Sequence, residues 1–220
     1  MPVNFAEPNC DGHAEPESRY ARSMEFSEVV RRRRMVRNYD PDKPVSRESL
    51  ERIAAAAQRG PSAGFSQGQR LVVVTEPARR QRVAEICEEP AYIAAGFDAW
   101  VSRAPALFIP TVSEAIYHRR YQEADKIQDD GTEINWPIPY WYTDIGATAL
   151  LVHLAAIDEG MAAGFLGLAD YTELKAYLGI PPEQQPIGVI TVGYAAPDRP
   201  SGSLKRGWVP NADFAHWEHW

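Results

Sequence analysis

Five arginines fall within seven consecutive positions, from Arg31 to Arg37, in a chain whose formal net charge is −7. Guanidinium groups bind phosphate oxygens through two parallel hydrogen bonds, so this run is a candidate anion site. The alternative is a solvated helix end, because cations near the last turn of a helix offset its dipole. The run alone leaves both interpretations open.

Other parts of the sequence narrow the choice of anion. A second basic pair, Lys205-Arg206, could converge with the first run on one ligand. Nucleic acid is disfavoured, because acidic residues outnumber basic ones by 30 to 23 and no further basic stripe or aromatic ladder extends the run. The two cysteines, Cys10 and Cys87, form no metal-ligand pattern with the five histidines, so we expect free thiols and no metal site.

A small polar loop offers a second kind of chemistry. Between Pro61 and Gln67 it supplies backbone N–H groups and polar side chains, which suit the polar edge of a flat ligand. Further along the chain, Gly164 and Gly167 would let a ring system approach the backbone closely.

Regular elements are expected to position these residues. A helix with Ser23 as its N-cap ends within the arginine run, and a second helix extends from its N-cap Ser46 to Gly60. Periodicity predicts strands at 71–75, 106–109 and 187–192, helices at 78–88, 93–101, 143–159 and 172–178, and a strand or loop at 163–168.

This order of elements predicts one α+β domain over residues 23–220, in which helices cover a sheet. Residues 1–22 are rich in Glu, Pro, Asn and Ser, and we expect a disordered or loosely docked arm there. The helix at 143–159 is apolar on most of its circumference, so His153 is expected to be a hydrogen-bonded core residue. No signal peptide or membrane-spanning apolar stretch is visible, which favours a cytoplasmic protein.

Residues 113–141 show no clean hydrophobic period, which predicts a long irregular segment. Segments of this kind are commonly functional lids, and the aromatic content argues against disorder. A structural flap between subunits is an equal alternative, and Glu123 with Lys126 could bind a zwitterionic substrate or form a solvated pair. The expected lid residues are Tyr117, Tyr121, Trp136, Tyr140 and Trp141.

Taken in order and spacing, these motifs resemble the FMN-dependent nitroreductase family from Met24 onward. The segment from Arg33 to Arg37 is similar to the family's opening basic motif. The loop from Pro61 to Gln67 is similar to its P-S-x-x-N-S-Q loop, with Phe65 where Asn is frequent. Further matches are the stretch 160–168, the strand into Gly193-Tyr194, and the basic pair before His216-Trp217.

The resemblance implies a central mixed sheet flanked by helices and an intertwined homodimer, with two FMN sites at the interface. It assigns the FMN phosphate to Arg33, Arg34, Lys205 and Arg206, and the pyrimidine edge of the flavin to Arg37, with Met35 in the same motif. From the other subunit, the residues that reach the cofactor would be Ser62, Ala63, Gly64 and Gln67. The isoalloxazine would contact Gly164, Phe165, Leu166 and Gly167, whereas Arg31 and Arg32 lie outside the motif.

Such a flavoprotein would be an NAD(P)H oxidoreductase. The dinucleotide would deliver a hydride, leave, and give way to a nitroaromatic, quinone or related conjugated acceptor in a ping-pong cycle. The cofactor would carry the reaction, so no catalytic side chain is expected. Two alternatives stay open: a flavin- or deazaflavin-binding protein with little turnover, and a specialised biosynthetic flavoenzyme of dehydrogenase or dehalogenase type. The sequence does not choose between NADH and NADPH.

Overall fold

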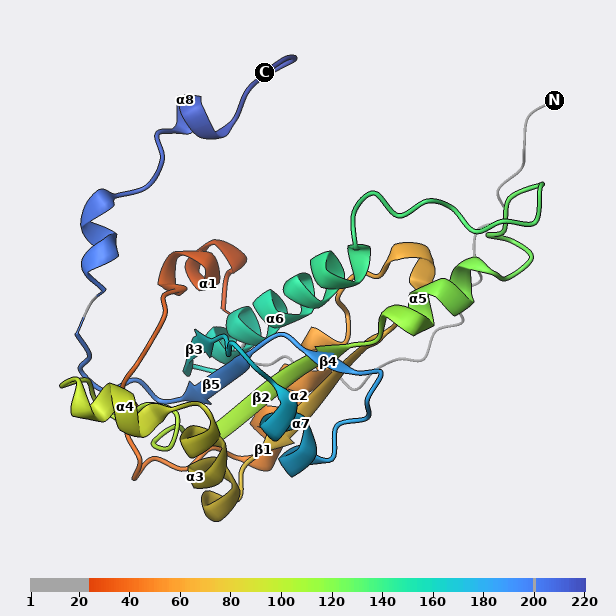
Figure 1. Cartoon of the computed structure of the whole chain (residues 1–220). Coiled ribbons are helices and arrows are strands. Elements are labelled where there is room, and N and C mark those ends of the chain that lie inside the picture. Colours follow the sequence, from red (N-terminus) through yellow and green to blue (C-terminus); the bar gives the residue numbers. More distant parts are fainter. Residues whose placement is uncertain (1–23, 200) are drawn as a thin grey trace.

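A five-stranded sheet lies at the centre of the computed structural model, which describes residues 24–199 and 201–220 (Figure 1). The main path of the sheet is β1-β2-β5-β3, and β4 also pairs with β2. All pairings between these strands are antiparallel, and an isolated parallel bridge joins Met35 to Ala163, so the sheet is mixed as expected. The strands are β1 (Gln69–Val74), β2 (Ala106–Val112), β3 (Ala162–Leu166), β4 (Gln185–Pro186) and β5 (Val189–Gly193).

Helices precede, separate and follow the strands. The α-helices are α1 (Phe26–Arg32), α2 (Arg47–Ala57), α3 (Pro77–Ile86), α4 (Glu89–Ala94), α5 (Glu114–Tyr121), α6 (Tyr140–Asp158), α7 (Thr172–Leu178) and α8 (Asn211–Phe214). Two short 3₁₀ helices are η2 (Ala63–Phe65) and η3 (Gly202–Arg206).

Strand β2 is buried along its whole length and defines the layers of the fold. Because side chains alternate along a strand, Leu107 and Ile109 face one side of the sheet while Ala106 and Phe108 face the other. The first side packs against α3 and α7, and the second packs against α2 and α6. This three-layer arrangement confirms the predicted α+β class.

Helix α6 contains 19 residues and begins at Tyr140, three positions before its expected start at 143. His153 on this helix is buried as predicted, but its ring makes no hydrogen bond within the part of the chain that the structure describes. The prediction of a hydrogen-bonded histidine is therefore wrong. In residues 24–199 and 201–220, no helix is long and apolar enough to cross a membrane.

Two helix boundaries confirm local signals in the sequence. The hydroxyl of Ser46 accepts the N–H of Ser49 at 3.1 Å, as an N-cap of α2 does. Gly179 has a left-handed backbone (φ 64°) and ends α7. Ser23 and the proposed arm at 1–22 lie outside the described residues, and α1 begins at Phe26.

The helix expected at 93–101 is wrong, because α4 spans Glu89–Ala94 and the chain turns after it. The side chain of Glu89 is 3% exposed, and its carboxylate accepts the N–H groups of Trp100, Val101 and Ser102 at 2.7, 2.6 and 3.3 Å. A buried carboxylate with three donors fixes this turn. The apolar residues after α4 therefore lie in a loop that Glu89 holds in place, and not along one face of a helix.

The segment at 113–141 is less irregular than expected, since it begins with α5. Tyr117 is the buried residue of that helix, and one buried position produces no hydrophobic period. The periodic signal that identified the other helices was therefore missing from this one.

Glu89→Ala is expected to lower the free energy of unfolding by about 3 kcal/mol, because three N–H donors lose a charged acceptor. In a chain of this length the same loss lowers Tm by roughly 6–12 °C. Urea and thermal unfolding measure both quantities. Glu85→Gln, at an exposed carboxylate of α3, serves as the control and is expected to change stability by less than about 0.5 kcal/mol. An unchanged Tm for Glu89→Ala would contradict the pinning role.

Candidate functional site

The arginine run leaves α1 as an extended segment that joins the edge of the sheet. The backbone of Arg33 is extended (φ −61°, ψ 115°), and the N–H of Val36 donates to the carbonyl of Ala163 at 3.1 Å. Side chains alternate along such a segment, so Arg33, Met35 and Arg37 lie on the side opposite to Arg34 and Val36.

Three of the five arginines have carboxylate partners. Arg31 and Arg32 bind Glu28 within α1 at 2.7 and 2.5 Å, as expected for a solvated helix face. These contacts, led by the hydrogen bond from Arg31, lower the pKa of Glu28 to about 2. Arg34 binds Asp198 at 2.7 Å, beyond β5. A phosphate ligand, which Arg34 was predicted to bind, would therefore compete with Asp198 for this guanidinium.

Arg33 and Arg37 have no carboxylate partner within residues 24–199 and 201–220. The guanidinium of Arg37 lies 5.8 Å from the ring centre of Trp100. Burial, together with the nearby charge of Arg33, lowers the pKa of His153 on α6 to about 4. His153 is consequently neutral at pH 7 and adds no positive charge here. Arg33 and Arg37 are therefore the cations of the run that stay available for an anionic ligand.

Most backbone N–H groups of the loop at 62–67 already donate hydrogen bonds within the protein. Four of its six N–H groups donate within the protein, three to loop atoms and that of Ala63 to the carboxylate of Asp144 at 2.8 Å. Among the described residues, the donors left for a ligand are the N–H groups of Ser62 and Gly64, the O–H of Ser62, whose oxygen accepts the N–H of Gln67, and the side-chain amide of Gln67.

Backbone strain is concentrated in the same loop. Gly64, Phe65 and Gln67 all have positive φ, at 59°, 57° and 53°. Glycine adopts this conformation readily, but for a bulky residue such as Phe65 it is unfavourable. Phe65 is also 77% exposed, so little packing among residues 24–199 and 201–220 offsets the strain.

The five predicted lid residues form one aromatic cluster with Trp136 at its centre. Ring centroids of Tyr117, Tyr121, Tyr140 and Trp141 lie 4.6 to 6.5 Å from that of Trp136. Cohesion of the cluster agrees with the lid prediction and equally with a structural flap.

The carboxylate of Glu133 fastens the cluster to α5. Glu133 accepts hydrogen bonds from Trp136 and His118 at 2.5 and 2.7 Å, and the contact with this carboxylate raises the pKa of His118. Of the two residues considered for a zwitterionic substrate, Glu123 binds Arg120 at 2.9 Å, while the ammonium of Lys126 lies 5.8 Å from the ring centre of Tyr121.

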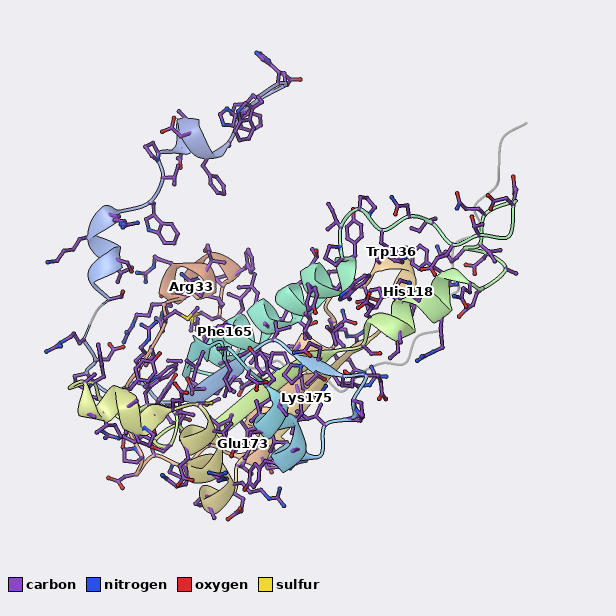
Figure 2. All side chains as sticks on the ribbon, in the orientation of Figure 1. Arg33, His118, Trp136, Phe165, Glu173 and Lys175 are labelled. Carbon is purple, nitrogen blue, oxygen red and sulfur yellow. The ribbon has the colours of Figure 1, made fainter. Side chains whose placement is uncertain are left out.

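The predicted site residues fall into two groups at opposite ends of α6. Figure 2 shows Arg33 and Phe165 near one end of this helix, and His118 and Trp136 beyond the other. A helix of 19 residues is roughly 28 Å long. The cations and the loop therefore do not meet around one ligand within a single chain.

Strand β3 contributes to the group that contains Arg33. Gly164 is enclosed, since a Cβ there would lie 2.4 Å from the carbonyl oxygen of Val36. Phe165 and Leu166 are half-buried, whereas Gly167 is exposed, and a Cβ there would lie 4.0 Å from the hydroxyl of Tyr171. Of the two glycines, Gly167 is thus the one with an open backbone. The other predicted phosphate ligands, Lys205 and Arg206, lie on η3 at the start of an exposed arm.

Comparisons with a family model and with known proteins agree with the resemblance found in the sequence. The model of the nitroreductase family matches residues 30–194. The chain belongs to the nitroreductase family. It is 25% identical over 207 residues to 5,6-dimethylbenzimidazole synthase of Rhodobacter capsulatus, covering 88% of this chain and 94% of that one. A match to YdgI of Bacillus subtilis, named as an NAD(P)H nitroreductase, is 31% identical over 65 residues and spans 31% of its length.

Solved structures of the family share the fold. A protein of Exiguobacterium sibiricum, solved in complex with FMN, superposes with a TM-score of 0.71 at 18% identity, covering 89% of this chain and 98% of that one. Membership in this family makes the chain an oxidoreductase of nitroreductase type.

Sequence reasoning missed three residues that organise the site. Asp198 binds Arg34, Asp144 holds the loop, and Arg120 donates to the carbonyl of Gly64 at 2.9 Å. Asp144 was visible only as a polar residue near a helix start, and neither of the others belongs to a motif. Their partners lie from 56 to 164 residues away, a distance that no local pattern spans.

Phe65→Asn is expected to raise Tm by roughly 2–4 °C, because Asn tolerates the left-handed backbone at a gain of about 1 kcal/mol. Thermal unfolding of the purified protein measures the change. Phe214→Asn replaces an equally exposed phenylalanine whose φ is negative, so the control should show no gain. A lower Tm for Phe65→Asn would show instead that its ring packs against a partner surface.

Proposed function

We propose that the protein is an FMN-dependent NAD(P)H oxidoreductase that reduces nitroaromatic, quinone or related conjugated acceptors. The observation that carries the proposal is a pair of cations, Arg33 and Arg37, which have no carboxylate partner among residues 24–199 and 201–220 and lie on the segment that joins β3. Membership in the family and its FMN-containing relative support FMN as the ligand. The name of YdgI supports NAD(P)H as the reductant.

The division of the site into two groups supports a homodimer. If each FMN site takes cations from one subunit and the loop from the other, both groups are used and two equal sites result. Large apolar side chains are also exposed on two of the helices near these groups: Phe26 on α1, and Tyr142 and Leu150 on α6. The arm at 201–220 extends away from the body of the chain (Figure 1) and exposes Trp208 and three further large aromatics. Such an arm fits a role in embracing a partner subunit, which would make the dimer intertwined.

The residues present fit FMN. Arg33, with Lys205 and Arg206 on the arm, would bind the phosphate, because guanidinium and ammonium groups supply charged donors for its oxygens. Arg37 would lie near the pyrimidine edge and favour negative charge there. The free N–H groups of Ser62 and Gly64 would donate to the polar edge from the other subunit.

When bound, FMN would supply hydride acceptance from the dinucleotide and hydride donation to the acceptor. The chain's own contribution is binding, orientation and exclusion of water. Planar acceptors pack well against aromatic rings, so Tyr121 and Trp136 would orient an acceptor and shield it from solvent.

A specialised biosynthetic flavoenzyme is the second candidate. The similarity to 5,6-dimethylbenzimidazole synthase extends over 88% of this chain, and that protein is biosynthetic by name. In this case the general reductase activity would be a side reaction. The two candidates share the flavin site and differ in the acceptor.

The first test is the visible spectrum of the purified protein, followed by identification of any chromophore released on denaturation. Twin visible bands and released FMN are expected, with rapid bleaching by NADH or NADPH under anaerobic conditions. Steady-state kinetics should give parallel double-reciprocal lines. Bound flavin that no dinucleotide bleaches would favour a binding or sequestering protein, and failure to bind added FMN would reject the proposal.

Arg33→Ala is expected to weaken FMN binding by about 1.5–3 kcal/mol, since a charged hydrogen bond is lost. That range corresponds to an increase in Kd of roughly 10- to 150-fold. Arg34→Ala should have a smaller effect, because its guanidinium is already bound by Asp198. Fluorescence titration of the apoprotein with FMN measures both, and Arg47→Ala on α2 is the control. Equal affinity of Arg33→Ala and the unaltered protein would refute the phosphate assignment.

A further inference from the structure

Asp144 is a buried carboxylate that joins two distant segments. It lies in the second turn of α6 and is 7% exposed. Its Oδ2 atom accepts the N–H of Ala63 at 2.8 Å and the hydroxyl of Tyr117 at 2.9 Å. Burying a charge is unfavourable unless it is hydrogen-bonded, so the two donors account for its place in the interior. One atom therefore connects the loop at 62–67 to helix α5.

Two glycines bring the same segments into direct contact. A Cβ on Gly64 would lie 2.6 Å from the ring of Tyr121, and a Cβ on Gly68 would lie 2.6 Å from the ring of Tyr117. The guanidinium of Arg120 also donates to the carbonyl of Gly64. The chain thus rests on α5 at Gly64, within the loop, and at Gly68, just after it, while the carboxylate of Asp144 holds the neighbouring Ala63.

We propose that Asp144 is a positioning residue that couples the loop at 62–67 to the aromatic cluster around Trp136. Displacement of one segment would break the hydrogen bond that orients the other. A ligand held by the loop and an acceptor that packs on the aromatic rings would then influence each other's binding. The identity of these two ligands rests on the function proposed above, whereas the mechanical coupling does not.

A simpler role for Asp144 makes a different prediction. A carboxylate near the N-terminus of α6 would stabilise that helix through its dipole alone. In that case, loss of the Tyr117 hydroxyl would leave the loop unchanged. Under the proposal, Tyr117→Phe alters the loop even though, among the described residues, the lost hydroxyl donates to Asp144 and forms no hydrogen bond with a loop atom.

Hydrogen exchange of the apoprotein tests the coupling without any cofactor. In Asp144→Ala, exchange of loop peptides and of α5 peptides should both accelerate, by about tenfold. Tyr117→Phe should accelerate loop exchange by roughly threefold, and Asp144→Asn should stay close to the unaltered protein, because its amide oxygen can accept both hydrogen bonds. Tyr177→Phe, on α7, controls for loss of a tyrosine hydroxyl elsewhere.

Holoenzyme measurements then test the consequence for ligands. Asp144→Ala should raise both the Kd for FMN and the KM for a nitroaromatic acceptor by about tenfold, and Tyr117→Phe should raise both by roughly threefold. The double variant should be no weaker than Asp144→Ala alone, since both changes remove one connection.

Two results would overturn the coupling: loop exchange unchanged in Tyr117→Phe, or strictly additive effects in the double variant. Tyr117→Phe removes only one hydroxyl and is expected to fold. It therefore decides the test even if Asp144→Ala does not fold. Altered exchange in a protein that binds no FMN would reject the proposed function and leave the coupling intact.

Discussion

Burial of α6 against the sheet and α2 separates the cations at 33–37 from the loop at 62–67 and the aromatic cluster, on which the proposed site depends. Ile145 and Val152 are fully buried along this helix, and close packing around them makes it a rigid spacer. The loop and the aromatic cluster lie at its first turns, and the unpartnered cations lie toward its other end. The length of one helix therefore sets the separation of the two groups. It is also the reason that the proposed function requires a second subunit.

Carboxylates organise the irregular parts of the molecule in one recurrent way. Glu89, Asp144 and Asp198 each accept at least one backbone N–H from a segment that is distant in sequence. A carboxylate oxygen can accept several donors at once, and its charge strengthens each hydrogen bond. Turns whose own sequences favour no particular backbone conformation are thereby held in one. In the loop at 62–67 this restraint coincides with unfavourable backbone angles, as is common where a structure prepares a ligand site.

The sequence was sufficient to predict the fold class, the main strands, the start of α2 and the end of α7, because periodicity and caps are local signals. It was insufficient for α4 and α5, whose positions depend on Glu89 and on a single buried tyrosine. For the site, the sequence predicted which residue types gather but not how they are partnered. The five arginines between positions 31 and 37 look equivalent in the sequence. Their division into partnered and unpartnered cations depends on Glu28, a near neighbour, and on Asp198, which lies 164 residues from Arg34.

That long separation has a consequence for the order in which the protein is made. The chain is synthesised from its N-terminus, so the arginine run emerges long before Asp198 does. Until then, Arg34 and the backbone of Arg37 lack the carboxylate that holds them in the finished fold. Arg31 and Arg32 can pair with Glu28 as soon as α1 forms, whereas Arg34 waits for its partner until the segment beyond β5 has been made. The Arg34–Asp198 contact therefore closes late in synthesis and joins an early segment of the chain to a late one.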